Sequence, residues 1–381
     1  MASEKTIIRD PVHGPIELTG LEQRILDSAP MQRLRHVRQL GLAHLVYPGA
    51  HHTRFEHSLG CLHLAQAMAH AIGLDEGSTQ RLRLAALLHD VGHLAFSHDS
   101  ESVTIKRFGD HEKRGAGIVC KSEIADLISG HDSPSSIARW MQGTSYGQLI
   151  TSDVGADRID YLLRDAHYTG VAYGVVDHPR ILSTLRWSAG APALRAGGLE
   201  AAESMIMARF EMFHAVYYHH AVRIIRAMLQ AAIRSALHEQ RFDWEAAQID
   251  GDSRMLVRLR TIPSARGWVE ALEARHLYKR ALMADWKMIG RKERKEAENG
   301  GLAEALSARC GCDVLVSPPE AFKSRTTIAM LMPQGAMPLE EASPLVGSLQ
   351  NAAEARAQLL IAAPEKNVKM VAQAAKKELG I

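Results

Sequence analysis

The chain has 381 residues, 46% of them hydrophobic, four cysteines and a formal net charge of +2 at pH 7. This length indicates one large domain or two unequal ones with enough apolar residues to bury a core without disulfides. The nearly balanced charge gives no footprint of a dedicated nucleic-acid binder.

The cysteines and the apolar runs indicate the cellular compartment in which the protein works. Cys61, Cys120, Cys310 and Cys312 have no framework spacing, which favours a reducing, cytoplasmic setting. We expect no signal peptide, because the N-terminus lacks a charged and then apolar leader, and no apolar run approaches the roughly 18 residues of a membrane span. The sequence therefore predicts a cytoplasmic protein with no membrane partner.

The chain begins with a strand pattern and then becomes helical. Residues 6–9 and 15–18 predict two short strands around a turn that contains Pro11 and Gly14. Apolar spacing predicts a helix over 53–73 with His57 in its first turn, and another over 79–88 with Ser78 as its cap.

The second of these helices runs into the pair His89-Asp90, followed by Val91, Gly92 and His93. The helix is almost entirely apolar, so the pair ends a buried segment, and buried charges must be paired or must bind a metal. Neighbouring helical residues point about 100° apart, so one ion needs ligands from other segments as well. The full candidate set is His57, His89, Asp90 and Asp157, which suits Mn, Fe, Zn, Ni or Mg.

Beyond the pair, His93, His98 and His111 gather in a less periodic stretch, where three histidines beside a metal site favour a catalytic interpretation. Residues 157–165 predict one helix on which Asp157, Tyr161 and Asp165 share a face, with Asp160 and Arg164 as an ion pair. A long helical region is expected over 200–238.

After residue 240 the pattern changes. Strand-like runs at 314–316, 327–331 and 359–361 alternate with helix patterns at 343–356 and 367–379. We therefore expect a mainly α protein: a helical body over 1–240 with a short N-terminal β-hairpin, then a helical extension and small α/β module over 241–381.

At this point several ordered motifs resemble those of the HD-domain phosphohydrolases, most closely the branch of deoxynucleoside triphosphate triphosphohydrolases. The similarity covers roughly the first 220 residues, in the segments 10–14, 32–35, 47–50, 54–58, 89–93 and 157–161, and it continues to Tyr218. It implies an HD-type helical bundle that hydrolyses deoxynucleoside triphosphates to deoxynucleoside and triphosphate.

The resemblance also assigns roles. His57, His89, Asp90 and Asp157 match the family's ligands for a divalent metal ion. His111 matches a proton donor, Glu101 an orienting carboxylate, and His93 and His98 histidines around the phosphates. The matched substrate contacts are Arg54 and Arg158 for the triphosphate, and Gln39, Leu40, Tyr161, Asp165 and Tyr218 for the sugar and base.

The pattern departs from the family at Glu101 and Arg158, where the family has Asp and Lys. The family's arginine of the later helix aligns next to Arg209 rather than on it. The physical chemistry of the implied reaction fits these residues. A divalent ion would polarise a phosphoryl oxygen, the arginines would offset the remaining charge, and an acid would protonate the alkoxide leaving group.

Two alternatives stay open. One is a stepwise nucleotide phosphatase or another HD phosphoesterase. The other is a non-catalytic nucleotide-sensing module, since Asp27, Gln32 and Arg35 match positions that bind an activating guanine nucleotide in a regulated family member. The resemblance thus implies a nucleotide substrate, a regulatory nucleotide and a homo-oligomer as partners.

Overall fold

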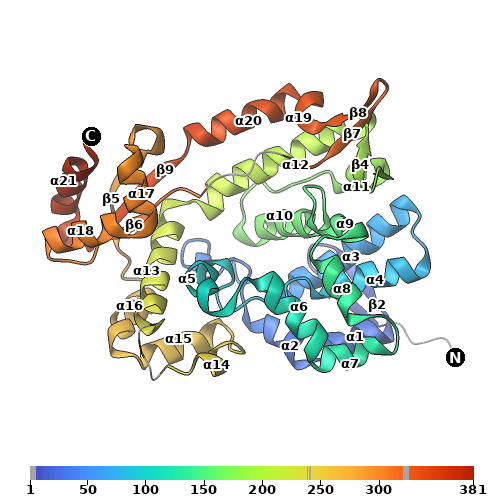
Figure 1. The fold of residues 1–381 in the computed structure, drawn as a ribbon, viewed down its shortest axis with the longest axis horizontal. Coiled ribbons are helices and arrows are strands. Elements are labelled where there is room, and N and C mark those ends of the chain that lie inside the picture. Colours follow the sequence, from blue (N-terminus) through green and yellow to red (C-terminus); the bar gives the residue numbers. More distant parts are fainter. Residues whose placement is uncertain (1–5, 238, 240–241, 321–325) are drawn as a thin grey trace. The chain divides into compact units, whose positions relative to one another are not determined.

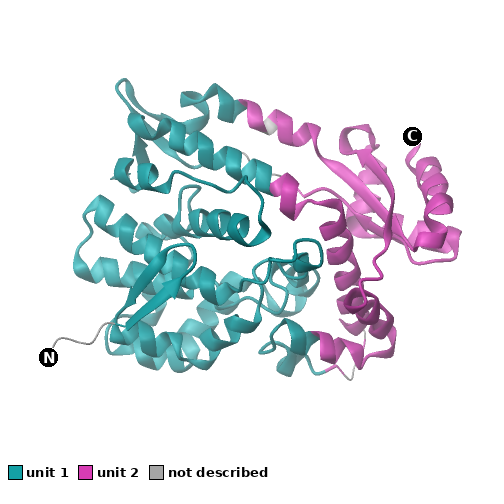
Figure 2. Cartoon of the chain, turned by 180° about the vertical axis from the view of Figure 1, so that it is seen from behind, with its two compact units in different colours: residues 1–212, 243–255, 325–347 teal, residues 213–242, 256–324, 348–381 magenta. Residues whose placement is uncertain are grey.

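The computed structural model describes residues 6–237, 239, 242–320 and 326–381 (Figure 1). The chain divides into two compact units (Figure 2). The first comprises residues 1–212, 243–255 and 325–347, and the second residues 213–242, 256–324 and 348–381. The described part of the chain contains no helix that is both long and apolar enough to span a bilayer.

The first unit is mainly helical and begins with the expected hairpin, in which β1 (Thr6–Asp10) pairs antiparallel with β2 (Gly14–Leu18). The helices that follow are α1 (Gly20–Leu26), α2 (Ala29–Arg33), α3 (Arg54–Ile72), α4 (Glu76–Leu88), α5 (His98–Phe108), α6 (His111–Lys121), α7 (Glu123–Ser129), α8 (Pro134–Met141), α9 (Gln148–Thr151), α10 (Ala156–Thr169), α11 (His178–Thr184), α12 (Leu199–Met212), α14 (Trp244–Ala247) and α19 (Leu339–Ala342). Short 3₁₀ turns lie at Leu34–His36, Ala43–Leu45, Ser145–Gly147 and Ala196–Gly198.

The core of this unit is the contact of α3 with α4 and α10. Leu84 and Leu88 of α4 are fully buried, as the apolar pattern predicted. The expected cap at Ser78 is wrong: α4 begins at Glu76, because the Asp75 side chain accepts a hydrogen bond from the Ser78 backbone and caps the helix a turn earlier.

A four-stranded sheet completes the first unit, in the order β3 (Leu185–Ser188), β4 (Ala191–Arg195), β7 (Ala329–Met332) and β8 (Gly335–Pro338). Strands β4 and β7 are parallel, with Leu194 opposite Met330. The strand predicted at 327–331 is therefore present, but it pairs within the first unit rather than with the other C-terminal strands.

The second unit holds the small α/β module. Its sheet has the order β5 (Lys279–Asp285), β9 (Gln358–Ala363) and β6 (Leu315–Ser317), with β9 antiparallel to both neighbours. The helices are α13 (His220–Leu237), α16 (Pro263–Glu273), α17 (Arg291–Asn299), α18 (Gly301–Cys310) and α21 (Val368–Leu379), with 3₁₀ turns at Trp286–Met288 and Glu365–Asn367. Leu306, Ile361 and Val371 lie in one shared core.

Two helices are split between the units, and one predicted helical region is interrupted. Residues of α15 (Asp252–Arg260) and α20 (Pro344–Ala355) are divided between the units. The helical region expected over 200–238 is present as far as residue 237, but it is interrupted: α12 ends at Met212, a π-helical turn follows at Phe213–Tyr217, and α13 begins at His220. The break is local, because the Tyr218 amide donates to Phe213 five residues earlier.

Candidate metal centre and phosphate-binding histidines

The predicted metal ligands lie on three elements of the first unit. His57 is in the first turn of α3, His89 and Asp90 follow α4, and Asp157 is in the first turn of α10. The helix α3 begins there because Thr53 and Glu56 form a capping box, in which Glu56 accepts from the Thr53 backbone. The starts of α3 and α10 and the end of α4 therefore bring residues 57, 89–90 and 157 to one place.

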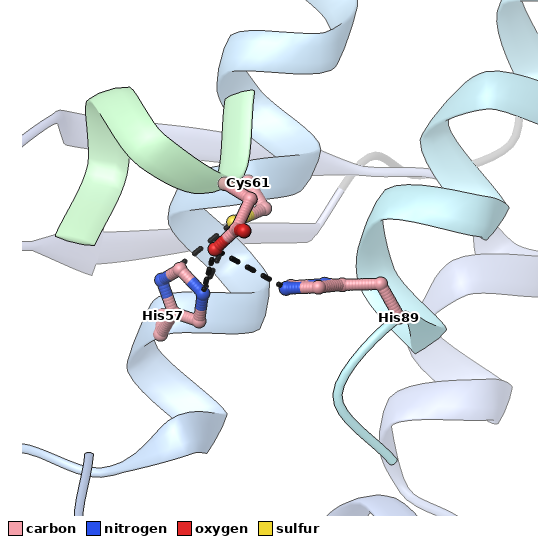
Figure 3. Close-up of side chains that lie close together, drawn as sticks. His57, Cys61 and His89 are labelled. Atoms are coloured by element: carbon pink, nitrogen blue, oxygen red, sulfur yellow. Dashed lines mark hydrogen bonds and ion pairs between the residues drawn. The ribbon is translucent and has the colours of Figure 1, made fainter. Parts of the chain in front are cut away.

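The four side chains converge. His57 Nε2 lies 3.1 Å from Asp157 Oδ1 and 3.6 Å from Asp90 Oδ2. His89 Nε2 lies 3.4 Å from Asp90 Oδ1 and 3.7 Å from Asp157 Oδ1. These are separations expected between ligands of a single cation, and the two imidazoles meet edge to face with ring centroids 5.1 Å apart (Figure 3).

Both imidazoles are held with Nε2 toward this point. His89 Nδ1 lies 2.8 Å from the Ala86 carbonyl, which can only accept, so Nδ1 carries the proton. His57 Nδ1 lies 2.7 Å from Asp160 Oδ2. Metal-binding histidines are fixed in this way by carbonyls and carboxylates behind them. The buried His89 Nε2 has no hydrogen-bond partner among the described residues, as expected of a nitrogen that awaits a ligand.

From the sequence, Asp160 was expected only to form an ion pair with Arg164. That pair is confirmed: both Asp160 oxygens accept from Arg164 at 2.9 Å. Arg164 is fully buried and also donates to Asp10 at 2.8 Å, while Asp160 accepts from His13 at 2.7 Å. Asp160 is therefore the anchor of His57 rather than part of a solvated helix face.

These contacts shift the pKa values of the candidate ligands. Burial opposes protonation of His57, but its contacts with Cys61 and the two aspartates outweigh the burial and raise its pKa well above 6.5. Burial also opposes ionisation of Asp157, and its hydrogen bonds with the two imidazoles nevertheless lower its pKa. Without a cation, the site holds protons on its imidazoles and charge on its carboxylates, so a divalent ion would replace those protons.

Three histidines form a second group beside this centre. The His93 ring stacks on His111 at a centroid distance of 4.0 Å, and His98 meets their edges at 4.7 and 5.1 Å. Glu101 lies 3.0 Å from His111 Nδ1 and 3.2 Å from His98 Nδ1. Its hydrogen bonds with these imidazoles outweigh burial and lower the Glu101 pKa, so one ionised carboxylate orients two rings.

His93 differs from its neighbours in burial. Its side chain is 1% exposed and that of His98 is 65% exposed. Burial and the nearby Arg54 guanidinium lower the pKa of His93 well below 6.5. The group therefore contains a buried neutral ring, His93, and an exposed one, His98. His93 Nε2 also lies 3.3 Å from Asp90 Oδ1, so the group borders the candidate metal ligands.

The loop between α4 and α5 is held by close packing at Gly92 and by a strained turn at Phe96 and Ser97. A Cβ at Gly92 would lie 2.0 Å from the His111 carbonyl oxygen, so only glycine brings α6 this near. Phe96 and Ser97 have φ of 63° and 55°, unusual for residues with side chains. The Phe96 amide donates to buried Asp252 at 2.7 Å, which stabilises this turn.

The predicted phosphate-contacting arginines already have protein partners. Arg54 forms a short ion pair with Asp90 and donates to Ser97 Oγ at 2.6 Å. Arg158 forms an ion pair with Asp153, a buried carboxylate that also lies 3.4 Å from Arg209. Thr327 donates to Asp153 through its amide at 2.8 Å. Asp153 was not singled out from the sequence, where no spacing links it to Arg209.

The predicted sugar and base contacts are divided between the units. In the first unit, Asp165 lies 2.8 Å from His52 Nε2, and Gln39 Oε1 is buried without a hydrogen-bond partner in the described chain. Leu40 and Tyr161 are partly buried. Tyr218 belongs to the second unit, where its ring stacks on Phe213 at 4.2 Å. Their contacts with a substrate stay predictions.

The comparisons with known proteins agree with this geometry. A model of the HD domain matches residues 54–165, and a model of the HD-associated region matches residues 176–381. An uncharacterized protein of Methanocaldococcus jannaschii is 33% identical over 95% of this chain and 80% of its own length. The human deoxynucleoside triphosphate triphosphohydrolase SAMHD1 is 29% identical over 60% of this chain and 44% of its own length.

Solved structures show the same fold. A hypothetical protein of Aquifex aeolicus superposes with a TM-score of 0.81 at 29% identity, over 97% of this chain and 99% of that one. A phosphohydrolase of Bacteroides thetaiotaomicron has a TM-score of 0.75 at 24% identity, over 95% of this chain and its own full length. The chain therefore belongs to the family of HD-domain metal-dependent phosphohydrolases.

Proposed function

We propose that this protein is a metal-dependent hydrolase that releases triphosphate from deoxynucleoside triphosphates. The observation that carries the proposal is the adjacency of the four candidate ligands to three histidines, two of which Glu101 orients. The 29% identity to human SAMHD1, whose name states this activity, supports the choice of substrate.

The residues fit a divalent ion. Two imidazole nitrogens with fixed tautomers and two carboxylates are donors of the kind that first-row metals prefer. When bound, the ion would act as a Lewis acid on a phosphoryl oxygen. His57, His89, Asp90 and Asp157 would hold it.

The chain's own side chains would handle the remaining charge and the proton. Arg54, Arg158 and Arg209 are cations that could bind phosphate oxygens in charge-assisted hydrogen bonds. His111, held through Nδ1 by Glu101, presents Nε2 as the group that would protonate the sugar oxygen as it leaves. Because Glu101 accepts from Nδ1, donation from Nε2 requires the imidazolium form of His111, in which both ring nitrogens carry protons.

The products test the proposal. We expect protein incubated with a panel of deoxynucleoside and nucleoside triphosphates, with added divalent metal, to yield a deoxynucleoside and inorganic tripolyphosphate in an ion-exchange chromatogram. Single phosphates together with a nucleoside diphosphate would favour the stepwise phosphatase instead. If the protein binds nucleotides without any turnover, the sensing module is the better interpretation.

A regulatory nucleotide is the second candidate, and a basic cavity favours it. A cavity of about 460 Å³ is lined by Arg33, Arg35, His36, Arg38, Ile249, Gly251, Ser253 and Arg254. Five of these side chains are basic and none is acidic, and Arg35 also lies beside Gln32, to which it donates at 2.9 Å. We expect Arg35→Ala to weaken binding of a guanine nucleotide measured by calorimetry, with unchanged metal content.

A further inference from the structure

We propose that Asp153 is the positioning residue of a two-arginine phosphate clamp, in which its carboxylate holds Arg158 and Arg209 in place for the phosphates of the substrate. The inference rests on the proposed function for its ligand, a chain of phosphates bound beside the metal ion. Asp153 lies in the turn between α9 and α10, and Arg158 directly follows the candidate metal ligand Asp157 in the first turn of α10. Arg209 reaches the same carboxylate from the last turn of α12.

The two oxygens of the Asp153 carboxylate have different partners. Oδ1 forms the ion pair with Arg158 and lies 3.4 Å from Arg209 Nη1. Oδ2 accepts hydrogen bonds from the Thr327 amide at 2.8 Å and from the Thr327 hydroxyl at 3.2 Å. One oxygen therefore serves both cations, while the other fixes the carboxylate to the segment that leads into β7.

The charges of these three side chains favour binding of an anion. Two neighbouring guanidinium groups repel each other unless a negative charge lies between them. Burial and the nearby Arg209 guanidinium lower the pKa of Arg158 to about 10, so the two cations are close enough to influence each other. Asp153 places one negative charge against two positive charges, and the excess positive charge suits a phosphate, which arginine binds through charge-assisted hydrogen bonds.

The arginines are accessible although the carboxylate between them is buried. The side chain of Asp153 is 5% exposed, whereas those of Arg158 and Arg209 are 23% and 17% exposed. A guanidinium carries five N–H donors, more than one carboxylate oxygen can accept. The alternative is that Asp153 occupies the phosphate position and competes with the substrate. Its two hydrogen bonds with Thr327 favour the positioning role, because they hold the carboxylate in place when a phosphate arrives.

Binding of inorganic tripolyphosphate tests the clamp without requiring turnover. It is measured by calorimetry on the full-length protein, with the same excess of Mg²⁺ in both solutions. Asp153→Ala removes the carboxylate that holds the arginines, so we expect the affinity to fall by about tenfold or more, the usual effect of losing hydrogen bonds to a charged group. Thr327→Val removes only the hydroxyl of an exposed residue, and the affinity should fall by roughly two- to fivefold.

Steady-state hydrolysis of deoxynucleoside triphosphates separates positioning from a structural role. Both variants should raise KM by these factors and leave kcat within about twofold, because the clamp binds the phosphates equally in the ground state and the transition state. The matched control is Asp132→Ala, which removes a carboxylate paired with Arg81 in the same unit and should leave both the tripolyphosphate affinity and KM unchanged.

Each failure has its own signature. Equal or tighter tripolyphosphate binding by a folded Asp153→Ala protein would overturn the proposal, because Asp153 would then compete with phosphate. If Asp153→Ala does not fold, unchanged binding by Thr327→Val overturns it instead. Absence of binding by the unmodified protein refutes the clamp. Binding without any hydrolysis refutes the proposed function, and the variants still test the clamp. Hydrolysis with an unaltered KM in both variants leaves the function standing and refutes the clamp alone.

Discussion

Asp160 shows at the scale of one residue how a buried charge network prepares a metal ligand. Its carboxylate accepts from His57, His13 and Arg164, and all three partners are almost fully buried. Gly60 makes the contact possible, because a Cβ there would lie 1.8 Å from Asp160 Oδ1. The carboxylate therefore sets both the tautomer and the basicity of His57.

We predict that Asp160→Asn weakens metal affinity by about 10- to 100-fold, the usual effect of losing such a carboxylate partner. Both asparagine and alanine remove one of the two carboxylate charges that balance buried Arg164, but asparagine keeps an acceptor for Nδ1 of His57 and for Arg164, whereas alanine removes both hydrogen bonds. Calorimetric titration with Zn²⁺ measures the affinity.

The matched control is Asp132→Asn, which changes a partner of Arg81 on the outer surface of the same unit. Its metal affinity should equal that of the unmodified protein. Unchanged affinity in a folded Asp160→Asn protein would show that Asp160 serves the fold and not the metal.

At the scale of elements, Asp252 at the start of α15 joins two separate loops of the first unit. It accepts from the Phe96 amide at 2.7 Å and the Arg38 amide at 3.0 Å. Ser97 Oγ donates to the Arg38 carbonyl at 3.0 Å, so the turn after His93 and the segment before α3 are fastened together. Burial raises the pKa of Asp252 to about 6.

This raised pKa predicts a pH dependence of stability. Between the unperturbed 3.8 and about 6, the folded protein binds more protons at Asp252 than the unfolded chain does. The contribution of Asp252 to the free energy of unfolding therefore falls as the pH rises through this window, by up to about 3 kcal/mol at 1.4 kcal/mol per pKa unit.

Urea unfolding of the unmodified protein and of Asp252→Asn at pH 4, 5, 6 and 7 measures the effect. The Asp252→Asn variant has no group that titrates at this position. The difference in free energy of unfolding between the two proteins should therefore change with pH between 3.8 and about 6 and be constant above that range. A pH-independent difference would contradict the raised pKa.

For the whole molecule, the helical body could be predicted from the sequence because it depends on local signals, and the proposed metal ligands were chosen from local motifs. Apolar periodicity marks α3 and α4, and His57, His89 and Asp157 stand at motif positions. The role of Asp160 was missed because its four-residue spacing to Arg164 also describes an exposed helix face. Asp153 was missed because its partners, Arg209 and Thr327, come from distant segments.

The parallel pair β4 and β7 could not be predicted either, because no local pattern specifies a partner strand more than 130 residues away. Ile328, Met330 and Leu339 of the returning segment are almost fully buried in the first unit. The domain boundary expected near residue 240 cuts this segment away from the helical body.

We therefore predict that a fragment of residues 1–240 is less stable than the full chain. The two lost hydrogen bonds from Thr327 to Asp153 alone are worth about 2 kcal/mol, and β4 would keep an unpaired edge that promotes aggregation. Thermal unfolding and light scattering of the fragment and the full chain measure both effects. A monomeric fragment with the melting temperature of the full chain would support the boundary at 240 instead.

The position of β7 late in the chain also affects how the protein folds during synthesis. On the ribosome, the residues of α3, α4 and α10 emerge long before residue 332, so the metal ligands can assemble while Asp153 still lacks the donors of Thr327. Contacts this distant along the chain close slowly. The nascent protein thus passes through an interval in which the bundle exists but its final sheet is unfinished, and a chaperone would find an open strand edge at β4.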